Sequence, residues 1–237
     1  MPSRPYEGQD LEALADMRRY QNWLLESFRT RLKGRRVLEV GAGIGNLSER
    51  YVDETSEAVL VEPAENLAAR LRDRFGGRRH VRTMAGSLAA VTPYLAPASF
   101  DSCILINVLE HVEDDKDMLL QLRALLKPNG ALLLFVPALP FLYGTLDALV
   151  NHHRRYTKSS LWSVVGEAGF SVHHLRYFDV LGVIPWFVAG RVLRRSRFDE
   201  TAARRYDRFV VPVGAMLERM GEPPLGKNLL CIANAVG

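Results

Sequence analysis

A run of glycines that follows directly on an apolar segment constrains the fold of this chain most. The run reads VLEVGAGIGNLS over 37–48, with Gly41, Gly43 and Gly45 at alternate positions. Glycine allows a sharp turn with positive φ, and it leaves room for a ligand close to the backbone at a helix N-terminus. The pattern predicts a buried strand over 35–40, a tight turn at a ligand site, and a helix beginning over 46–52.

Strands and helices alternate along the first part of the chain. Further strands are predicted over 58–61, 80–84, 99–107, 131–136, 171–178 and 229–235. Helices are predicted over 9–32, 66–75, 115–126 and 158–168, the last closed by Gly169. Strands that alternate with helices indicate βαβ units and a parallel sheet buried on both faces. The segment 180–227 interrupts the pattern, since it is apolar at first and then rich in arginine.

Composition limits the class of protein without naming it. The 237 residues carry a formal net charge of +4, too dilute to argue for nucleic acid, although 26 of the 31 basic residues are Arg. Cys103 and Cys231 lie in apolar runs, which predicts buried thiols in a reducing compartment. The first residues contain no apolar signal core, and the apolar run 181–190 is too short to cross a bilayer. We therefore expect a cytoplasmic location.

The spacing of acids and glycines separates two kinds of nucleotide site. Glu62 follows Gly41 by 21 residues, at the predicted end of the second strand, where a carboxylate can accept hydrogen bonds from ribose hydroxyls. The dinucleotide fingerprint GxGxxG is not met, because Asn46 stands where its third glycine belongs. Glu39 precedes the first glycine by two residues. This spacing disfavours a nicotinamide oxidoreductase.

The pattern E-x-G-x-G-x-G after a strand, with an acid ending the next strand, resembles the class I S-adenosylmethionine-dependent methyltransferases (methyltransferase type 11/12-like). FDSCILINVLEHV (100–112) and LLKPNGALLLFVPA (125–138) extend the resemblance, which covers about 35–180. It implies an α/β, Rossmann-like fold: a mostly parallel seven-stranded sheet with an antiparallel last strand and a helical insert before that strand. The expected parts are an N-terminal helical cap (1–34), a cofactor-binding domain (35–179 and 228–237) and a helical insert or lid (180–227).

The resemblance also implies the cofactor, S-adenosylmethionine, and its contacts. Glu39 and the glycine turn correspond to the methionine end, Glu62 to the ribose-binding acid, and Pro63 lies beside the adenine. Ser87 stands where the family usually has Asp at the adenine edge. The residues expected to bind cofactor are Glu39, Gly41, Ala42, Gly43, Gly45, Asn46, Glu62, Pro63, Gly86, Ser87, Leu88, Asn107 and Val108.

Acceptor chemistry is expected after the fourth and fifth strands. Methyl transfer to an alcohol needs a base that removes the hydroxyl proton. The run LDALVNHHRRYT (146–157) resembles one found in bacterial cell-envelope and polysaccharide methyltransferases, with Asn151 where Gly is usual. The resemblance favours His152 as the base, Asp147 as its orienting partner, and His111 as a further catalytic candidate. Residues expected to bind substrate are His153, Arg154, Arg155 and Tyr156.

Each of these roles has a structural alternative. Arg154, Arg155 and Tyr156 would equally hold the helix that starts near residue 159, and His111 would equally hold the loop after the fourth strand. A divalent metal such as Mg²⁺ is a further hypothesis, with Asp147, His152 and His153 as ligands and Glu110 as an additional one. The ligand spacing alone is not diagnostic.

The expected reaction is O-methylation of a saccharide or lipid-linked saccharide. The alternatives are a small-molecule or quinone-type acceptor and a non-catalytic cofactor-binding protein. A nucleic-acid substrate is disfavoured because the Asn/Asp-Pro-Pro-Tyr/Phe motif and a dense basic stripe are both missing from the sequence. The segment 180–198 combines apolar and Arg residues. It is expected to be a lid or homodimer contact, or an amphipathic helix at the inner face of the membrane.

Overall fold

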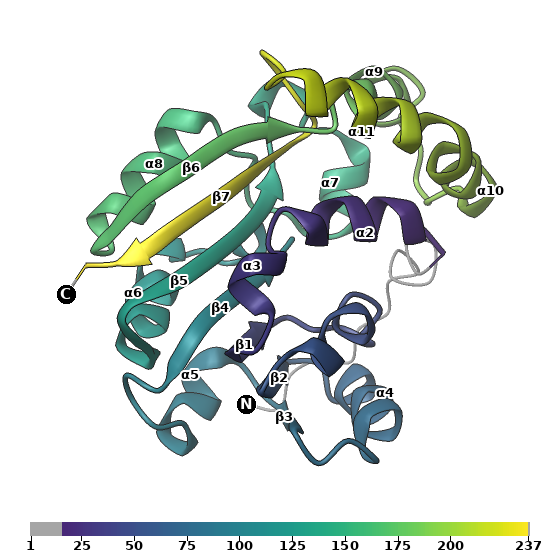
Figure 1. Cartoon of the computed structure of the whole chain (residues 1–237). Coiled ribbons are helices and arrows are strands. Elements are labelled where there is room, and N and C mark those ends of the chain that lie inside the picture. Colours follow the sequence, from purple (N-terminus) through teal and green to yellow (C-terminus); the bar gives the residue numbers. More distant parts are fainter. Residues whose placement is uncertain (1–15, 237) are drawn as a thin grey trace.

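A seven-stranded sheet forms the centre of the computed structural model, which describes residues 16–236 (Figure 1). The strands are β1 (Arg36–Val40), β2 (Glu57–Glu62), β3 (Val81–Ala85), β4 (Phe100–Ile106), β5 (Leu126–Pro137), β6 (Phe170–Phe178) and β7 (Asn228–Ala235). Their order is β3-β2-β1-β4-β5-β7-β6, and β7 runs antiparallel to both of its neighbours. The predicted fold is confirmed. The chain crosses between β1 and β4, so a ligand crevice belongs at the carboxyl ends of these two strands.

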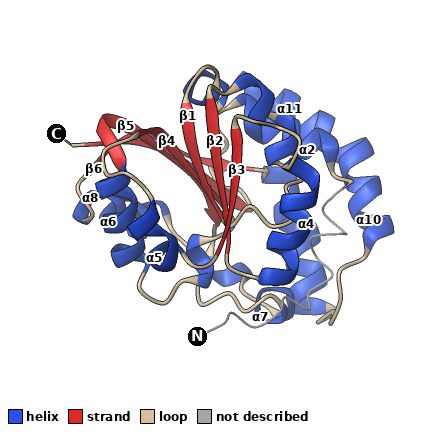
Figure 2. Ribbon diagram, turned by 90° about the horizontal axis from the view of Figure 1, so that it is seen from below, coloured by secondary structure: helices blue, strands red, loops and turns tan. Residues whose placement is uncertain are grey.

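Helices cover both faces of the sheet. The α-helices are α2 (Arg18–Glu26), α3 (Arg29–Leu32), α4 (Glu65–Phe75), α5 (Leu88–Val91), α6 (Asp115–Leu125), α7 (Thr145–Leu149), α8 (Lys158–Glu167), α9 (Val183–Phe187), α10 (Glu200–Arg205) and α11 (Val211–Met220). Figure 2 shows α5, α6 and α8 on one side of the sheet and α2, α4 and α11 on the other.

Short helical turns complete the structure. The 3₁₀ turns are η1 (Ser48–Arg50), η2 (Val52–Glu54), η3 (Thr92–Tyr94), η4 (Leu109–His111), η5 (Pro140–Leu142) and η6 (Val180–Gly182), and two π-helical segments are η7 (Val188–Val192) and η8 (Tyr206–Val210).

Side chains along the central strands point alternately to the two faces of the sheet, so they contribute to two hydrophobic clusters. In β4, Cys103 and Leu105 pack into one hydrophobic cluster, whereas Ile104 packs into the cluster on the opposite face. A strand covered on both sides needs apolar residues on both faces, and the unbroken apolar runs 58–61 in β2 and 103–106 in β4 supply them. Both cysteines are buried and free, as predicted. Within residues 16–236, none of the helices has the length and apolar character that a bilayer span requires.

The segment after the glycine turn differs from the prediction. Instead of a helix over 46–52, it forms the 3₁₀ turns η1 and η2. Two hydroxyl groups of this segment, Ser48 Oγ and Tyr51 OH, donate to the buried Glu39 Oε2 at 2.6 and 2.7 Å. We attribute the irregular backbone to these inward bonds, which compete with a regular helix.

Three other boundaries differ. The predicted helix over 9–32 lies partly outside the described residues, and its described part is divided into α2 and α3. Strand β5 begins at Leu126, not at residue 131, because Phe100 of β4 already pairs with Leu126. Within the segment 180–198 the chain is helical only over 180–192, where η6, α9 and η7 follow one another directly, and it forms no helix over 193–198.

Candidate active site

The glycine turn is held so closely by its neighbours that side chains do not fit. Gly41, Gly43 and Gly45 all have positive φ, at +74°, +57° and +80°. A Cβ on Gly41 would lie 2.4 Å from Val108 Cγ2, and one on Gly45 would lie 2.4 Å from Phe75 Cε2. The turn after β1 therefore touches the loop after β4 at Gly41. These glycines serve packing as well as backbone conformation.

Glu62 fastens the turn to the end of β2. Its Oε2 accepts from the Gly43 amide at 2.8 Å and its Oε1 from the Ala64 amide at 2.9 Å. Burial raises the pKa of Glu62, and the two amide hydrogen bonds offset part of that rise. Each carboxylate oxygen has a further lone pair, so two hydroxyl donors can still bind.

Glu39 lies under the turn, with 3% of its surface exposed. Burial raises the pKa of this carboxyl, while hydrogen bonds from Ser48 and Tyr51 act in the opposite direction. Glu39 therefore has a structural duty, holding η1 and η2, in addition to the methionine-end role that the family resemblance implies.

The side chains of three residues predicted to bind cofactor contact other parts of the protein instead. Asn46 Oδ1 accepts from Arg74 Nη1 at 2.9 Å, which turns its side chain toward α4. Ser87 Oγ caps α5 by accepting from the Ala90 amide, and Leu88 is buried in the core. The structure thus gives these side chains local roles that the glycine pattern did not predict.

The other predicted cofactor residues lie along the same edge of the sheet. Ala42 is buried within the turn, whereas Pro63 is exposed beside Glu62. Gly86 donates its amide to the Glu62 carbonyl at 3.0 Å. Asn107 is exposed at the end of β4 with φ of +52°, and it precedes Val108.

The segment 138–156, here called the acceptor loop, is closed at its base. Ala138 and Tyr156 form a parallel β-bridge. The Leu139 amide donates to the Tyr156 carbonyl at 3.0 Å, and the Tyr156 amide donates to the Pro137 carbonyl at 2.8 Å. The loop therefore leaves the end of β5 and returns to the same point, carrying its polar residues over the carboxyl edge of the sheet.

His152 and Asp147 form a hydrogen-bonded pair inside this loop. His152 Nδ1 lies 2.9 Å from Asp147 Oδ1, and Arg155 Nε donates to the same oxygen at 2.8 Å. Burial alone would raise the pKa of Asp147, but the hydrogen bonds and charge of His152 and Arg155 hold it below its usual value. Ionised Asp147 can only accept, so the His152 proton belongs on Nδ1 and leaves Nε2 as a basic nitrogen.

Two residues of η4 face this histidine. Glu110 Oε1 lies 3.7 Å from His152 Nε2, and the rings of His111 and His152 meet edge-on with centroids 4.7 Å apart. Glu110 is fully buried, and neither of its carboxyl oxygens has a hydrogen-bond partner among the described residues. Burial raises the pKa of Glu110 to about 8, so it is largely neutral at pH 7.

His111 contributes a second imidazole at the mouth of the site. The residue is exposed, yet the protein packed around its ring, together with the neighbouring His152, lowers its pKa to about 4. His111 is therefore neutral at physiological pH. The sequence predicts Glu110 only as a metal ligand. Its position beside His111 in LEHV is the one sequence feature that indicates its place near His152.

Only two of the predicted metal ligands, His152 and Glu110, belong to the group that gathers. The described group with ligand atoms within 4.8 Å of one another is Glu110, His111 and His152. Asp147 is instead engaged by Arg155 and His152, and His153 is exposed. One carboxylate and two imidazoles do not match the oxygen-rich octahedron that Mg²⁺ prefers. The predicted Mg²⁺ site therefore fits these residues poorly.

Most residues predicted to bind substrate instead fasten the loop. Arg155 Nη1 donates to the Ala138 carbonyl at 2.8 Å. Tyr156 OH donates to Asp115 Oδ2 at 2.8 Å, and Arg154 Nη1 donates to the same atom at 2.9 Å. Their polar groups are satisfied inside the protein, which supports the structural alternative.

Trp186 of α9 brings the insert to the His152–Asp147 pair. Its Nε1 lies 3.4 Å from Asp147 Oδ2, within hydrogen-bond distance. The Arg155 guanidinium lies 5.1 Å and the Lys227 ammonium 5.4 Å from the centre of its ring system, both at cation–π range. The sequence offered no signal for this contact, because nothing local links residue 186 to residue 147.

The insert also packs on the backbone beside Asp147. A Cβ on Gly144 would lie 2.7 Å from the Gly190 carbonyl oxygen, and Thr145 Oγ1 donates to the Arg195 carbonyl at 2.7 Å. Segment 188–195 therefore covers the start of α7.

A strand order that switches at β1, a glycine turn there, and a buried acid ending β2 define a nucleoside-binding α/β enzyme. Residues 12–175 match the family model described as a methyltransferase domain. The chain belongs to this family, the S-adenosylmethionine-dependent methyltransferases.

Curated relatives carry related names. A ubiquinone biosynthesis O-methyltransferase of Idiomarina loihiensis is 29% identical over 57% of this chain and 61% of its own length. A namesake in Xanthomonas euvesicatoria is 35% identical over 46% of this chain and 45% of its own length. An uncharacterized protein of Mycobacterium tuberculosis is 27% identical over 86% of this chain and 69% of its own length. The chain thus spans less than two thirds of the two named enzymes.

Solved structures share the fold. A methyltransferase from Archaeoglobus fulgidus has a TM-score of 0.62 at 18% identity, covering 92% of this chain and 94% of its own. Phosphoethanolamine N-methyltransferase 2 of Haemonchus contortus, solved with S-adenosylmethionine, has a TM-score of 0.61 at 15% identity, covering 92% of this chain and 52% of its own.

The site fits the cofactor of the family. The positive-φ glycines leave the backbone at the end of β1 without side chains, and each carboxylate oxygen of the buried Glu62 keeps a lone pair for a hydroxyl donor. When bound, S-adenosylmethionine supplies an electrophilic methyl group on a sulfonium centre.

Proposed function

We propose that this enzyme methylates a hydroxyl group of a small acceptor with a substantial apolar part, with His152 as the general base. The carrying observation is the His152–Asp147 pair beside the loop that touches the glycine turn. Val108 contacts Gly41, and Glu110, two residues further on, faces His152. One short segment thus adjoins both the cofactor turn and the base.

The proposed chemistry is a direct displacement. The acceptor oxygen attacks the methyl carbon, the bond from that carbon to sulfur breaks, and a neutral thioether leaves. His152 Nε2 takes the hydroxyl proton, and Asp147 stabilises the resulting imidazolium through Nδ1. Because the leaving group is already good, alignment of the acceptor contributes most of the remaining catalysis.

Two observations favour an apolar small molecule as the acceptor. Two of the relatives are named ubiquinone biosynthesis O-methyltransferases, and ubiquinone is an apolar quinone. The insert segment that contacts Asp147 also carries exposed apolar residues, with Ile184 73% and Phe187 39% accessible. A saccharide acceptor would be better served by exposed polar groups.

A methyl-transfer screen tests the proposal. Purified enzyme is incubated with S-adenosylmethionine labelled in the methyl group, together with either phenols bearing an apolar tail or mono- and oligosaccharides. We expect label to enter the phenols at the oxygen, as read by mass spectrometry. Transfer to saccharides alone, or to nitrogen or carbon, would contradict the proposed acceptor.

A further inference from the structure

We propose that one face of the helix formed by η8 and α11, residues 206–220, docks on an anionic membrane surface. The net charge of the chain is concentrated in the insert that contains this helix. Segment 180–227 holds nine basic and five acidic residues, whereas the rest of the chain holds 22 of each. The whole net charge of +4 therefore resides in the insert, the part of the molecule that lies over the acceptor loop.

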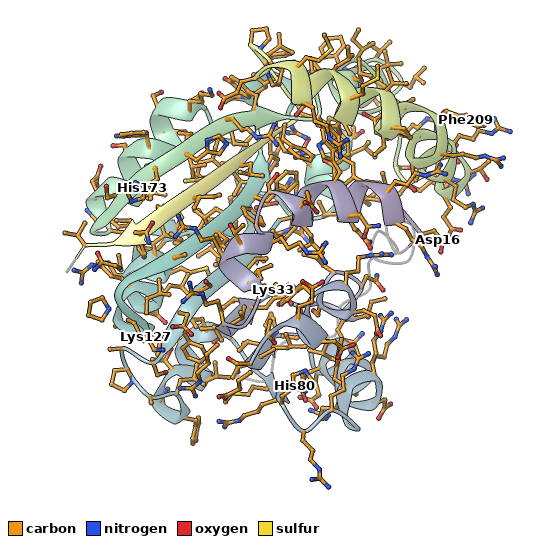
Figure 3. The ribbon with its side chains drawn as sticks, viewed as in Figure 1. Asp16, Lys33, His80, Lys127, His173 and Phe209 are labelled. Carbon is orange, nitrogen blue, oxygen red and sulfur yellow. The ribbon has the colours of Figure 1, made fainter. Side chains whose placement is uncertain are left out.

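The outer face of this helix is apolar. Phe209, Val213, Met216 and Met220 are 63%, 46%, 58% and 81% exposed. Their spacing of four, three and four residues puts them on a single helical stripe. Figure 3 shows Phe209 at the outer edge of the insert, pointing away from the sheet. A stripe of large, exposed apolar side chains is costly in water and indicates a contact surface.

The acids of the helix are turned inward. Asp207 accepts hydrogen bonds from the backbone amides of Arg19 and Tyr20, at 3.2 and 2.8 Å. Glu218 is 2% exposed in its side chain and pairs with Arg176 at 2.9 Å. The outer face thus presents no carboxylate from residues 206–220.

Arginines flank the stripe on its exposed side. Arg205, Arg208 and Arg219 are exposed, and helical spacing puts all three along one edge of the apolar stripe. An apolar stripe edged by arginine is the composition of a helix that lies in the membrane interface, where the cations meet lipid phosphates.

This surface is distinct from the one expected over 180–198. In that segment Trp186 turns inward to Asp147, Arg191 Nη1 donates to the Tyr143 carbonyl, and Arg195 pairs with Asp199. Those groups hold the insert together.

Charge also argues for lipid over a second copy of the chain. A two-fold dimer pairs the same patch with itself. Because the arginines lie along one edge of the stripe and near both of its ends, an antiparallel pair of helices would put Arg208 of one copy beside Arg219 of the other copy. An anionic bilayer offers the opposite charge along the whole helix.

Vesicle sedimentation tests the proposal with the full chain alone, so its failure is separate from any failure of the proposed reaction. We expect binding to phosphatidylglycerol vesicles in low salt, and at least tenfold weaker binding to phosphatidylcholine vesicles or in 0.5 M salt. The double variant Phe209→Ser/Met216→Ser should weaken binding at least tenfold, and Arg208→Gln/Arg219→Gln should remove the preference for anionic lipid.

The matched control removes two exposed apolar side chains elsewhere. Tyr94 and Leu120 are 71% and 45% exposed and lie outside the insert. Tyr94→Ser/Leu120→Ser should bind vesicles like the parent chain, with circular dichroism verifying that every variant is folded. Equal binding by the two Ser double variants would overturn the proposal. So would a chain that ignores vesicles but forms a dimer that Phe209→Ser/Met216→Ser dissociates.

Discussion

Trp186 Nε1 and Asp147 Oδ2 lie 3.4 Å apart, although 39 residues separate them in the chain. This contact joins the insert to the carboxylate that orients His152. Asp147 is thereby held by three side chains, with His152 and Arg155 on Oδ1 and Trp186 on Oδ2. The position of the insert and the orientation of the base are therefore mechanically linked.

The variant Trp186→Phe tests this link. Phenylalanine keeps the aromatic ring for Arg155 and Lys227 but lacks the donor, and the 3.4 Å distance implies a modest bond of about 1 kcal/mol. We expect kcat to fall about three- to tenfold with the dissociation constant of S-adenosylmethionine unchanged. Trp162→Phe, at an exposed position on α8, is the matched control. A Trp186→Phe enzyme with parental kcat would remove the positioning role.

Replacing His152 by alanine should remove the base while sparing the cofactor site. General-base catalysis contributes roughly 10²–10⁴-fold, so kcat should fall by about that factor. Calorimetry should find S-adenosylmethionine binding within twofold of the parent. His153→Ala, the exposed neighbour, should retain most activity. Similar turnover in both variants would assign the base elsewhere.

Glu62→Gln should weaken cofactor binding. Both carboxylate oxygens accept backbone amides, but glutamine offers one acceptor, so its NH₂ group would face the amide of Gly43 or Ala64. We expect the dissociation constant of S-adenosylmethionine to rise at least tenfold and unfolding stability to fall by about 1–3 kcal/mol. Glu65→Gln, exposed on the adjoining helix, should change neither quantity.

Glu110 predicts a pH dependence of stability. Burial raises its folded pKa to about 8, above the ordinary 4.5, so the folded state holds the proton more tightly than the unfolded state. The stabilisation is full below pH 4.5 and is lost as pH rises through about 8. Glu110→Gln mimics the neutral acid. Urea unfolding at pH 6 and pH 9 should therefore show a smaller stability loss in this variant than in the parent, and an equal loss would contradict the buried, neutral state.

Turnover should not require Mg²⁺. The described donor set of Glu110, His111 and His152 has two imidazoles and one carboxylate, which is unlike the oxygen shell of Mg²⁺. Enzyme treated with EDTA should keep its kcat within twofold, and added Mg²⁺ should not raise it. A fivefold activation by Mg²⁺ would restore the metal hypothesis.

Local patterns predicted the sheet, the glycine turn after β1 and the buried acid that ends β2. The alternation of elements and the spacing from Glu39 to Gly45 to Glu62 depend on residues close in sequence. The 3₁₀ segment after the turn was missed because its cause is tertiary. Ser48 and Tyr51 are compatible with a helix in the local sequence, but in the structure both donate hydrogen bonds to the buried carboxylate of Glu39.

For the acceptor side of the site, the sequence predicts which residues are present but not which of them contact one another. The sequence predicts the His152–Asp147 pair, but it assigns the neighbouring Arg155 to substrate binding. In the structure, Arg155 contacts Asp147 instead. Arg155 serves Asp147 and the Ala138 carbonyl inside the protein, while Trp186 enters from 39 residues away. Such contacts depend on how an irregular insert folds back, and no periodic pattern encodes that.

The bridge between Ala138 and Tyr156 makes the acceptor loop a unit that can evolve separately from the sheet. A loop clamped at its base can change length and content between its anchors without moving the strands that hold the cofactor. Acceptor preference can then diverge among relatives while methyl-donor binding stays fixed. A chimera in which a relative with a different substrate supplies residues 139–155 should fold normally. It should methylate the acceptors of that relative.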